Sequence, residues 1–394
     1  MGGDAVVVFD TRDFGVLRLC SLCRYIPVRL QKKFQTPMFE PKVFVTLRNH
    51  KLLRMQTNRM SYKLTQDGRE VLAEMGFSYP EDSRTTINKD SYYRRLRTSL
   101  FNITLYLAGI DIFYEDLRLL AGTDKGFASS LLLRKDNDDK VISGTRFLGI
   151  LKSGSTAYIP YYIQNRDEWI YPRFEREMFM SQISAMRNIN NVEIILAGKN
   201  LQELLKSVLT KYQSKPEPNG LKRFDIALEE LGCDYLFLPL DDLGVMQMKV
   251  TMTSRYRERV TDALGCEPVT VPTLTECDGM LGGIPYVVGF DFNVRRILRA
   301  LKQVERYNPG LELKICCFSF QASALESLLR GLDIRNAIIV TLKDKAIHGI
   351  FPELFIKDNA LQMYQGKEGV GFDASERHIR KDDVEISEDY EDIL

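Results

Sequence analysis

From about residue 145 to residue 365, short apolar strand-like runs alternate with amphipathic helical runs, and this alternation constrains the fold most. Two stretches, "STAYIPYYIQN" (155–165) and "GGIPYVVGFDFN" (282–293), each read as the second strand of a hairpin. A helix, a strand, a second helix and a closing strand are predicted after each of them. Such alternation predicts an α/β protein whose sheets are covered by helices.

The two stretches share the order hairpin, helix, strand, helix, strand, and both contain Ile-Pro-Tyr. We therefore predict two duplicated α/β units, over 145–250 and 251–365. Identity beyond the tripeptide is thin. The alternative is a chance succession of two ordinary α/β units.

The first 80 residues have a different predicted order of elements: three helical segments, a hairpin and a further helix. Apolar spacing predicts helices at 12–22, in "YIPVRLQKKF" (25–34) and in "EPKVFVTLRNHKLL" (40–53), the last two with a proline near the first turn. "LLRMQTNRMSYKLT" predicts two short strands about a polar turn at 57–59, and Thr65 is the expected N-cap of the next helix. This order is typical of a winged helix-turn-helix domain, which we predict over 1–80.

The net charge of +1 conceals a strong asymmetry. Residues 12–69 hold thirteen Lys and Arg against three acids, which leaves +10, whereas the tail at 366–394 holds four against ten, which leaves −6. A helical linker region is expected over 81–144, with Arg94, Arg95 and Arg97 beside two tyrosines. This cluster either extends the basic head or belongs to an amphipathic connector, and the acidic tail either aids solubility or competes with DNA for the basic face.

The basic head predicts contact with duplex DNA. A recognition helix presents polar side chains to base edges in the major groove, while cations on its flanks and on the wing meet phosphates. The candidates on the helix side are Lys42, Thr46, Arg48, Asn49 and Lys51, and those at the wing are Arg54, Arg59 and Lys63. The alternative is a solvated basic face on a domain that binds protein.

Enzyme motifs are incomplete, and we predict no catalytic residue, cofactor or metal site. The chain has no glycine-rich phosphate loop and no G-x-S-x-G, and its three histidines are far apart in sequence. Cys20 and Cys23 form a CxxC without a second pair, which favours packing in a helix. The enzymatic alternative is a divergent metal-dependent nuclease, which needs an Asp and a Glu-x-Lys on adjacent strands. Glu312 and Lys314 supply the second element, but a predicted helix separates them from Asp291, and the Asp138-x-Lys140 match falls in a charged loop.

The phrase "LRNHKLLRMQTNRMSYKLTQDGREVL" resembles the recognition helix and wing of winged helix-turn-helix domains. Together with "FLGILKSGSTAYIPYYIQNRDEW" before a helix "EREMFMSQI", it resembles the replication-relaxation proteins of plasmids and conjugative elements of Gram-positive bacteria. The resemblance covers 1–80 and 145–185. It implies a winged helix followed by an α/β domain similar to the restriction-endonuclease fold, often without its catalytic residues.

The expected function is therefore that of a DNA-binding protein of a mobile element. The winged helix would grip double-stranded DNA, and the α/β region would serve assembly or a second nucleic-acid contact. A homodimer is expected because two half-sites multiply affinity. An odd number of cysteines without disulfide spacing favours the cytoplasm, and no apolar run is long enough to predict a membrane partner. A third alternative is a protein-interaction scaffold that binds no DNA.

Overall fold

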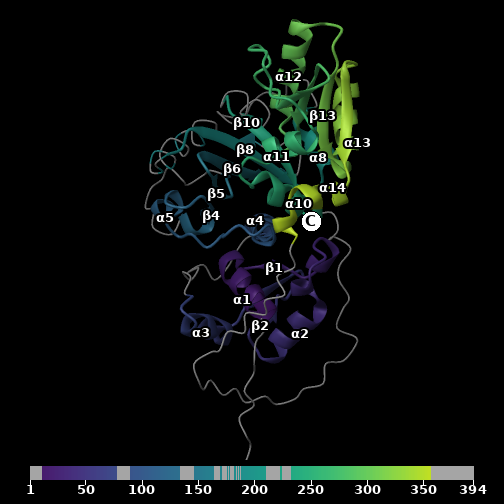
Figure 1. The fold of residues 1–394 in the computed structure, drawn as a ribbon. Coiled ribbons are helices and arrows are strands. Elements are labelled where there is room, and N and C mark those ends of the chain that lie inside the picture. Colours follow the sequence, from purple (N-terminus) through teal and green to yellow (C-terminus); the bar gives the residue numbers. More distant parts are fainter. Residues whose placement is uncertain are drawn as a thin grey trace, which may run out of the picture. The chain divides into compact units, whose positions relative to one another are not determined.

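The computed structural model describes residues 11–77, 89–133, 146–163, 169–170, 175, 177, 182, 184, 186, 188–209, 222–223 and 232–355. These residues form two compact units that divide after Ile103, called unit 1 and unit 2 here (Figure 1). Residues 81–88 at the start of the expected linker region (81–144), the charged loop with Asp138 and Lys140, and the acidic tail lie outside the described residues, as do the expected domain boundaries after residues 80 and 144. The rest of 81–144 is not a separate linker, because the strand at Lys125–Ser129 belongs to the five-stranded sheet and residues from Thr104 onward belong to unit 2.

Unit 1 combines helices with a small antiparallel sheet in the order β1-β3-β2. Its elements are α1 (Thr11–Cys23), β1 (Ile26–Pro27), two 3-10 turns (Leu30–Lys32 and Pro37–Phe39), α2 (Pro41–Asn49), β2 (Leu53–Met55), β3 (Ser61–Leu64), α3 (Gln66–Glu74) and the first part of α4 (Lys89–Leu107). The predicted hairpin and the helix after Thr65 are confirmed.

The helix predicted over 25–34 is wrong. Arg24 has a φ of 64°, which ends α1, and Ile26 then pairs with Tyr62 of β3. Pro27 therefore lies at the edge of a sheet, where its missing N–H costs no ladder hydrogen bond. The residues that follow form only 3-10 turns.

Aromatic rings connect these turns to the sheet in the core of unit 1. The ring centroids of Phe34 and Phe39 are 6.2 Å apart, and those of Phe39 and Phe44 are 6.4 Å apart. Phe44 of α2 then stacks on Tyr62 of β3 with centroids at 4.7 Å. This series fixes α2 against one face of the sheet, called the inner face.

Unit 2 contains a five-stranded sheet in the order β10-β8-β6-β5-β4. β4, β5 and β6 pair antiparallel in succession, and β6, β8 and β10 run parallel. The strands are β4 (Lys125–Ser129), β5 (Gly149–Ser153), β6 (Thr156–Tyr162), β8 (Asn191–Gly198) and β10 (Asp234–Pro239). The helices of this part are α5 (Leu117–Ala121), α6 (Ser130–Leu133), α8 (Leu201–Leu209) and α10 (Asp242–Thr251), and β7 (Trp169–Ile170) pairs with β9 (Lys222–Arg223).

A second sheet of unit 2 has the order β11-β12-β13-β14. Its strands are β11 (Gly279–Leu281), β12 (Ile284–Val288), β13 (Leu313–Phe318) and β14 (Ala337–Leu342). The helices are α11 (Tyr256–Ala263), α12 (Val294–Tyr307), α13 (Ala322–Gly331) and α14 (Asp344–Ile350), with 3-10 turns at Ser319–Gln321 and Pro352–Leu354.

Strand order and sense are the same in the two sheets from β5 to β10 and from β11 to β14. Each set begins with an antiparallel hairpin and continues with two parallel strands. The shared Ile-Pro-Tyr does not occupy equivalent positions, however. Ile284 is the first residue after its hairpin turn, whereas Ile159 is the fourth after its own. The likeness of the two sheets therefore depends on topology and not on that tripeptide.

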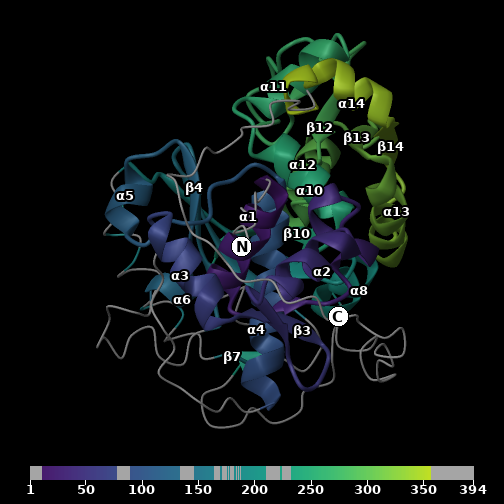
Figure 2. The same cartoon turned by 90° about the horizontal axis from the view of Figure 1, so that it is seen from below.

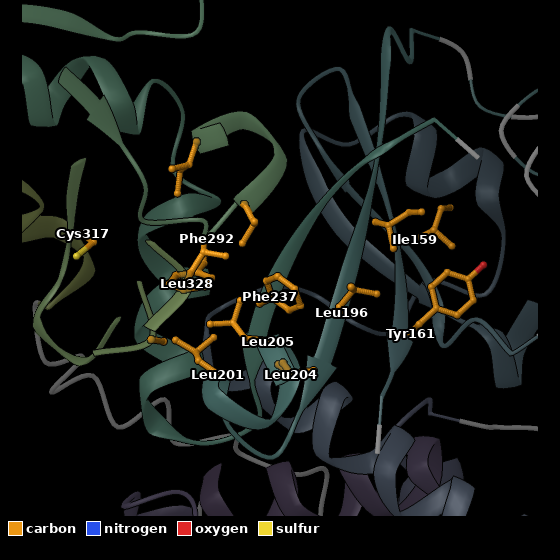
Figure 3. Packing of buried hydrophobic residues seen from close by; sticks show 14 of the residues in the cluster. Ile159, Tyr161, Leu196, Leu201, Leu204, Leu205, Phe237, Phe292, Cys317 and Leu328 are labelled. Carbon is orange, nitrogen blue, oxygen red and sulfur yellow. The ribbon is translucent and has the colours of Figure 1, made fainter. Parts of the chain in front are cut away.

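One apolar cluster spans both sheets. Figure 3 shows Phe237 of the first sheet between Leu196 and Phe292, with Leu328 of α13 beyond them. The rings of Phe237 and Phe292 meet edge to face at 6.1 Å. The chain is thus an α/β protein with mixed sheets, and none of its described helices is long and apolar enough to cross a membrane.

Candidate functional site

α2 has one buried face and one exposed face. Its apolar residues at helical spacing, Val43, Phe44 and Leu47, are buried. The helix begins at Pro41, where a proline sacrifices no hydrogen bond, and ends at Asn49, four residues earlier than predicted. The side chains on the other face are exposed or half-buried and comprise Lys42, Val45, Thr46, Arg48 and Asn49.

The turn after α2 is held by the next helix. Lys51 has a φ of 58°, and the Thr65 hydroxyl donates to the carbonyl oxygens of Lys51 and Leu52. The same hydroxyl accepts from the Gly68 amide at 3.1 Å, as the predicted N-cap. A Cβ on Gly68 would lie 2.3 Å from the Leu52 carbonyl oxygen, so only glycine lets α3 approach this closely. Lys51 is therefore fixed on a rigid turn, outside the helix on which it was predicted.

Two cations of α2 have partners within unit 1. The Nζ of Lys42 lies 2.6 Å from Glu40 Oε2, but the lysine side chain is 68% exposed, so this pair contributes little and opens readily. Burial raises the pKa of Tyr62, and the charge and hydrogen bond of Arg48 partly offset this rise. Arg48 accordingly lies against the tyrosine of β3 and is held between helix and sheet.

The β2–β3 hairpin places two predicted cations directly opposite each other. Arg54 pairs with Lys63 in the antiparallel register, a position where like charges repel. Arg59 lies in the tip with a φ of 54°, and its amide donates to Gln56 O at 2.8 Å.

Side-chain alternation separates the predicted residues into two sets. Because Tyr62 faces α2 across the inner face of the sheet, Lys63 and its partner Arg54 project from the opposite face, the outer face. The exposed side of α2 points away from the sheet in the other direction. We call Lys42, Thr46 and Asn49 the helix face, and Arg54 and Lys63 the sheet face. Lys51 is exposed on the turn between α2 and β2, and Arg59 is exposed on the turn between β2 and β3.

α4 packs on the outer face of the sheet, because Ser61, which projects from the same face as Lys63, contacts Tyr92 of α4 (Figure 2 shows unit 1 from below). The Tyr92 hydroxyl lies 2.7 Å from Ser61 Oγ and donates to Asn58 Oδ1 at 3.3 Å. Ser99 donates to the Tyr25 carbonyl at 2.6 Å. This tether of the hairpin to α4 has no signal in the local sequence pattern, because its partners are more than thirty residues apart.

The CxxC is part of the core, as predicted. Cys20 and Cys23 are buried, and burial raises the pKa of the Cys23 thiol to about 12. A buried, protonated thiol is a poor nucleophile.

The partial nuclease motif is not assembled among the described residues. Glu312 precedes β13 at its amino end, whereas Asp291 follows the parallel neighbour β12 at its carboxyl end. Lys314 lies over the ring of Tyr286, 5.3 Å from its centroid. No group of three His, Cys, Asp or Glu residues suited to a metal ion occurs in the described part of the chain.

Asp291 belongs instead to an ion-pair network that the sequence did not reveal. It is 5% exposed and accepts from Arg257 Nη2 at 2.5 Å and from the Tyr256 hydroxyl at 2.9 Å. Burial alone would raise the pKa of Asp291, but the nearby Arg257 and Arg296 hold it below its usual value. Burial, with the charge of Asp291, raises the pKa of Glu193 on β8 to about 7. This network joins α11 and the second sheet to the first.

Comparison with protein-family models, with curated proteins and with solved structures finds no match to the chain.

Proposed function

We propose that unit 1 is a winged helix that binds double-stranded DNA, with α2 as its recognition helix and the β2–β3 hairpin as its wing. The order α1, β1, α2, β2, β3, α3 and the small antiparallel sheet packed on helices support this assignment. The excess of ten positive charges over 12–69 supports an anionic partner.

The observation that carries the proposal is the division of α2 into a buried apolar face and an exposed polar one. Asn49 and Thr46 have the hydrogen-bonding groups that read base edges, and the exposed Val45 offers an apolar contact for a thymine methyl group. Lys42 reaches phosphate once its exposed pair with Glu40 opens. Lys51 and Arg59, on rigid turns, meet the backbone on either side of the groove.

For the whole chain, we propose a cytoplasmic DNA-binding protein of the replication-relaxation type, carried by a plasmid or conjugative element. The similar strand order of the two sheets of unit 2 supports duplicated α/β units, which would serve assembly or a further DNA contact. A homodimer would place two copies of unit 1 on two half-sites of the DNA.

The test is fluorescence anisotropy with a labelled duplex and the full chain. Asn49→Asp and Lys42→Gln should each weaken binding about tenfold or more, since they remove a base-edge donor or a phosphate contact. The matched control is Gln66→Glu, which changes charge at an exposed position of α3. Equal affinity of wild type and both α2 variants would refute the assignment of α2 as the recognition helix.

A further inference from the structure

We propose that β14 is the surface through which two copies of this chain associate, by antiparallel pairing of β14 with the same strand of a second copy. The pairing would join the two four-stranded sheets into one continuous sheet. This inference rests on the homodimer in the proposed function and is independent of DNA binding. β14 is the outermost strand of its sheet (Figure 2).

The open edge of β14 distinguishes it from the other edges of the two sheets of unit 2. Each of the other three edge strands has a bridging residue on its outer side: Phe113 beside Ala128 of β4, Asn293 beside Leu236 of β10, and Glu267 beside Met280 of β11. Among the described residues, only those of β13 pair with the backbone of β14. Its outer row of amides and carbonyls is therefore uncovered in that part of the chain.

The register shows which backbone groups point outward. The Leu313 amide donates to the Asn336 carbonyl at 2.9 Å, in continuation of the parallel ladder between β13 and β14. Successive residues of a strand direct their backbone groups to alternate sides, so every second residue from Asn336 faces β13. The intervening residues, Ala337, Ile339 and Thr341, direct their N–H and C=O groups to the open edge. Such a row is a template for another strand.

The sequence of β14 does nothing to block this edge. Natural edge strands are protected by charges, by proline or by being very short, whereas β14 has six residues, "AIIVTL", with neither a charge nor a proline. Its Ile338 is 37% exposed, and Leu332, in the connection from α13, is 50% exposed. Uncovered apolar surface thus accompanies the uncovered backbone.

The order of the side chains favours a second copy as the partner. β14 is nearly symmetric about Ile339, with the β-branched Ile338 and Val340 on either side and the small Ala337 and Thr341 beyond them. A two-fold axis at Ile339 places Ile338 opposite Val340 of the second copy, an apolar cross-strand pair. The same register lets the outward amides and carbonyls of the two strands bond to each other.

Sedimentation equilibrium of the full chain tests the inference. Ile338→Lys places a charge in the apolar cross-strand contact and should raise the dimer dissociation constant about tenfold or more. Thr341→Pro removes an outward N–H that makes no bond to β13, and it should have an effect of about the same size.

Two matched controls should dimerise like wild type. Leu281→Lys makes a similar change at a side chain that is 38% exposed on β11, where Glu267 already bridges the edge. Thr341→Val changes the side chain but keeps the outward amide.

Hydrogen exchange reports on the strand itself. The amides of Ala337, Ile339 and Thr341 should exchange about tenfold or more faster when the wild-type chain is diluted to the monomer. The amides of Ile338 and Val340, which bond to β13, should remain protected in both forms.

The outcomes separate this surface from the rest of the proposed function. A dimer that neither Ile338→Lys nor Thr341→Pro weakens would overturn the proposed surface and leave the homodimer intact. A wild-type monomer, or outward amides equally protected at every dilution, would also overturn the inference. Anisotropy with a labelled duplex on the same samples reports separately on DNA binding, so a monomer that binds duplex would leave the assignment of unit 1 standing.

Discussion

Lys51 occupies a backbone position that favours glycine. Replacing it with glycine should raise the stability of unit 1 and weaken DNA binding. Its φ of 58° lies in the left-handed region, which costs an L-residue about 1–2 kcal/mol. Lys51→Gly removes this cost but adds about 0.4–1 kcal/mol of entropy to the unfolded chain. The expected net gain in the free energy of unfolding is about 0.5–1 kcal/mol, or a rise in the Tm of unit 1 of roughly 2–8 °C for a domain of this size.

The same substitution removes one phosphate contact. The slope of log K against log salt concentration should become shallower by about 0.9, and duplex affinity should fall at low salt. Differential scanning calorimetry and anisotropy titrations at several salt concentrations measure the two effects. A variant that is more stable yet binds less well would explain why a lysine occupies position 51, where glycine would give a more stable fold.

Two controls accompany this experiment. Lys51→Arg keeps the charge and the strained backbone and should change neither property. Asp333→Gly relieves a similar strain in unit 2, where φ is 52°, and should leave DNA binding unchanged. A lower Tm for Lys51→Gly, or an unchanged salt slope, would refute the reasoning.

Three further predictions concern contacts within unit 1 or within unit 2. Gly68→Ala should lower the free energy of unfolding of unit 1 by about 1–3 kcal/mol in a denaturant melt, because its Cβ would meet the Leu52 carbonyl; an unchanged midpoint would contradict this close approach. Arg257→Met should destabilise unit 2 by about 2–4 kcal/mol by leaving Asp291 buried without its cation, and adding Asp291→Asn should restore part of the loss. Glu193 has a folded pKa of about 7 against an ordinary value of 4.5, so its contribution to stability is present below pH 4.5 and is lost as pH rises to 7. Glu193→Gln should flatten the unfolding free energy of unit 2 between pH 5 and 7, whereas a wild-type slope in that variant would exclude this carboxyl as the cause.

Local signals in the sequence were sufficient where an element depends on its own residues. Pro41 and Thr65 mark helix starts through the physics of the first turn, and both helices begin there. The strand at Ile26 could not be seen in this way, because it exists only through pairing with Tyr62, thirty-six positions further on.

The candidate site shows the same limit. Cationic side chains are evident in the sequence, but the direction of each depends on which face of the sheet packs against α2 and which against α4. The stacking of Phe44 on Tyr62 decides this, and it separates Arg54 and Lys63 from Lys42 and Asn49. The network around Asp291 depends in the same way on contacts between distant elements, with Arg257 thirty-four positions away.

The salt dependence of duplex binding by the intact chain tests the central claim most directly. If Lys42, Lys51 and Arg59 contact phosphates, log K should fall linearly with log salt concentration by about 0.9 for each contact, which gives a slope of roughly −3. A slope near zero, or no duplex binding at low salt, would contradict the account.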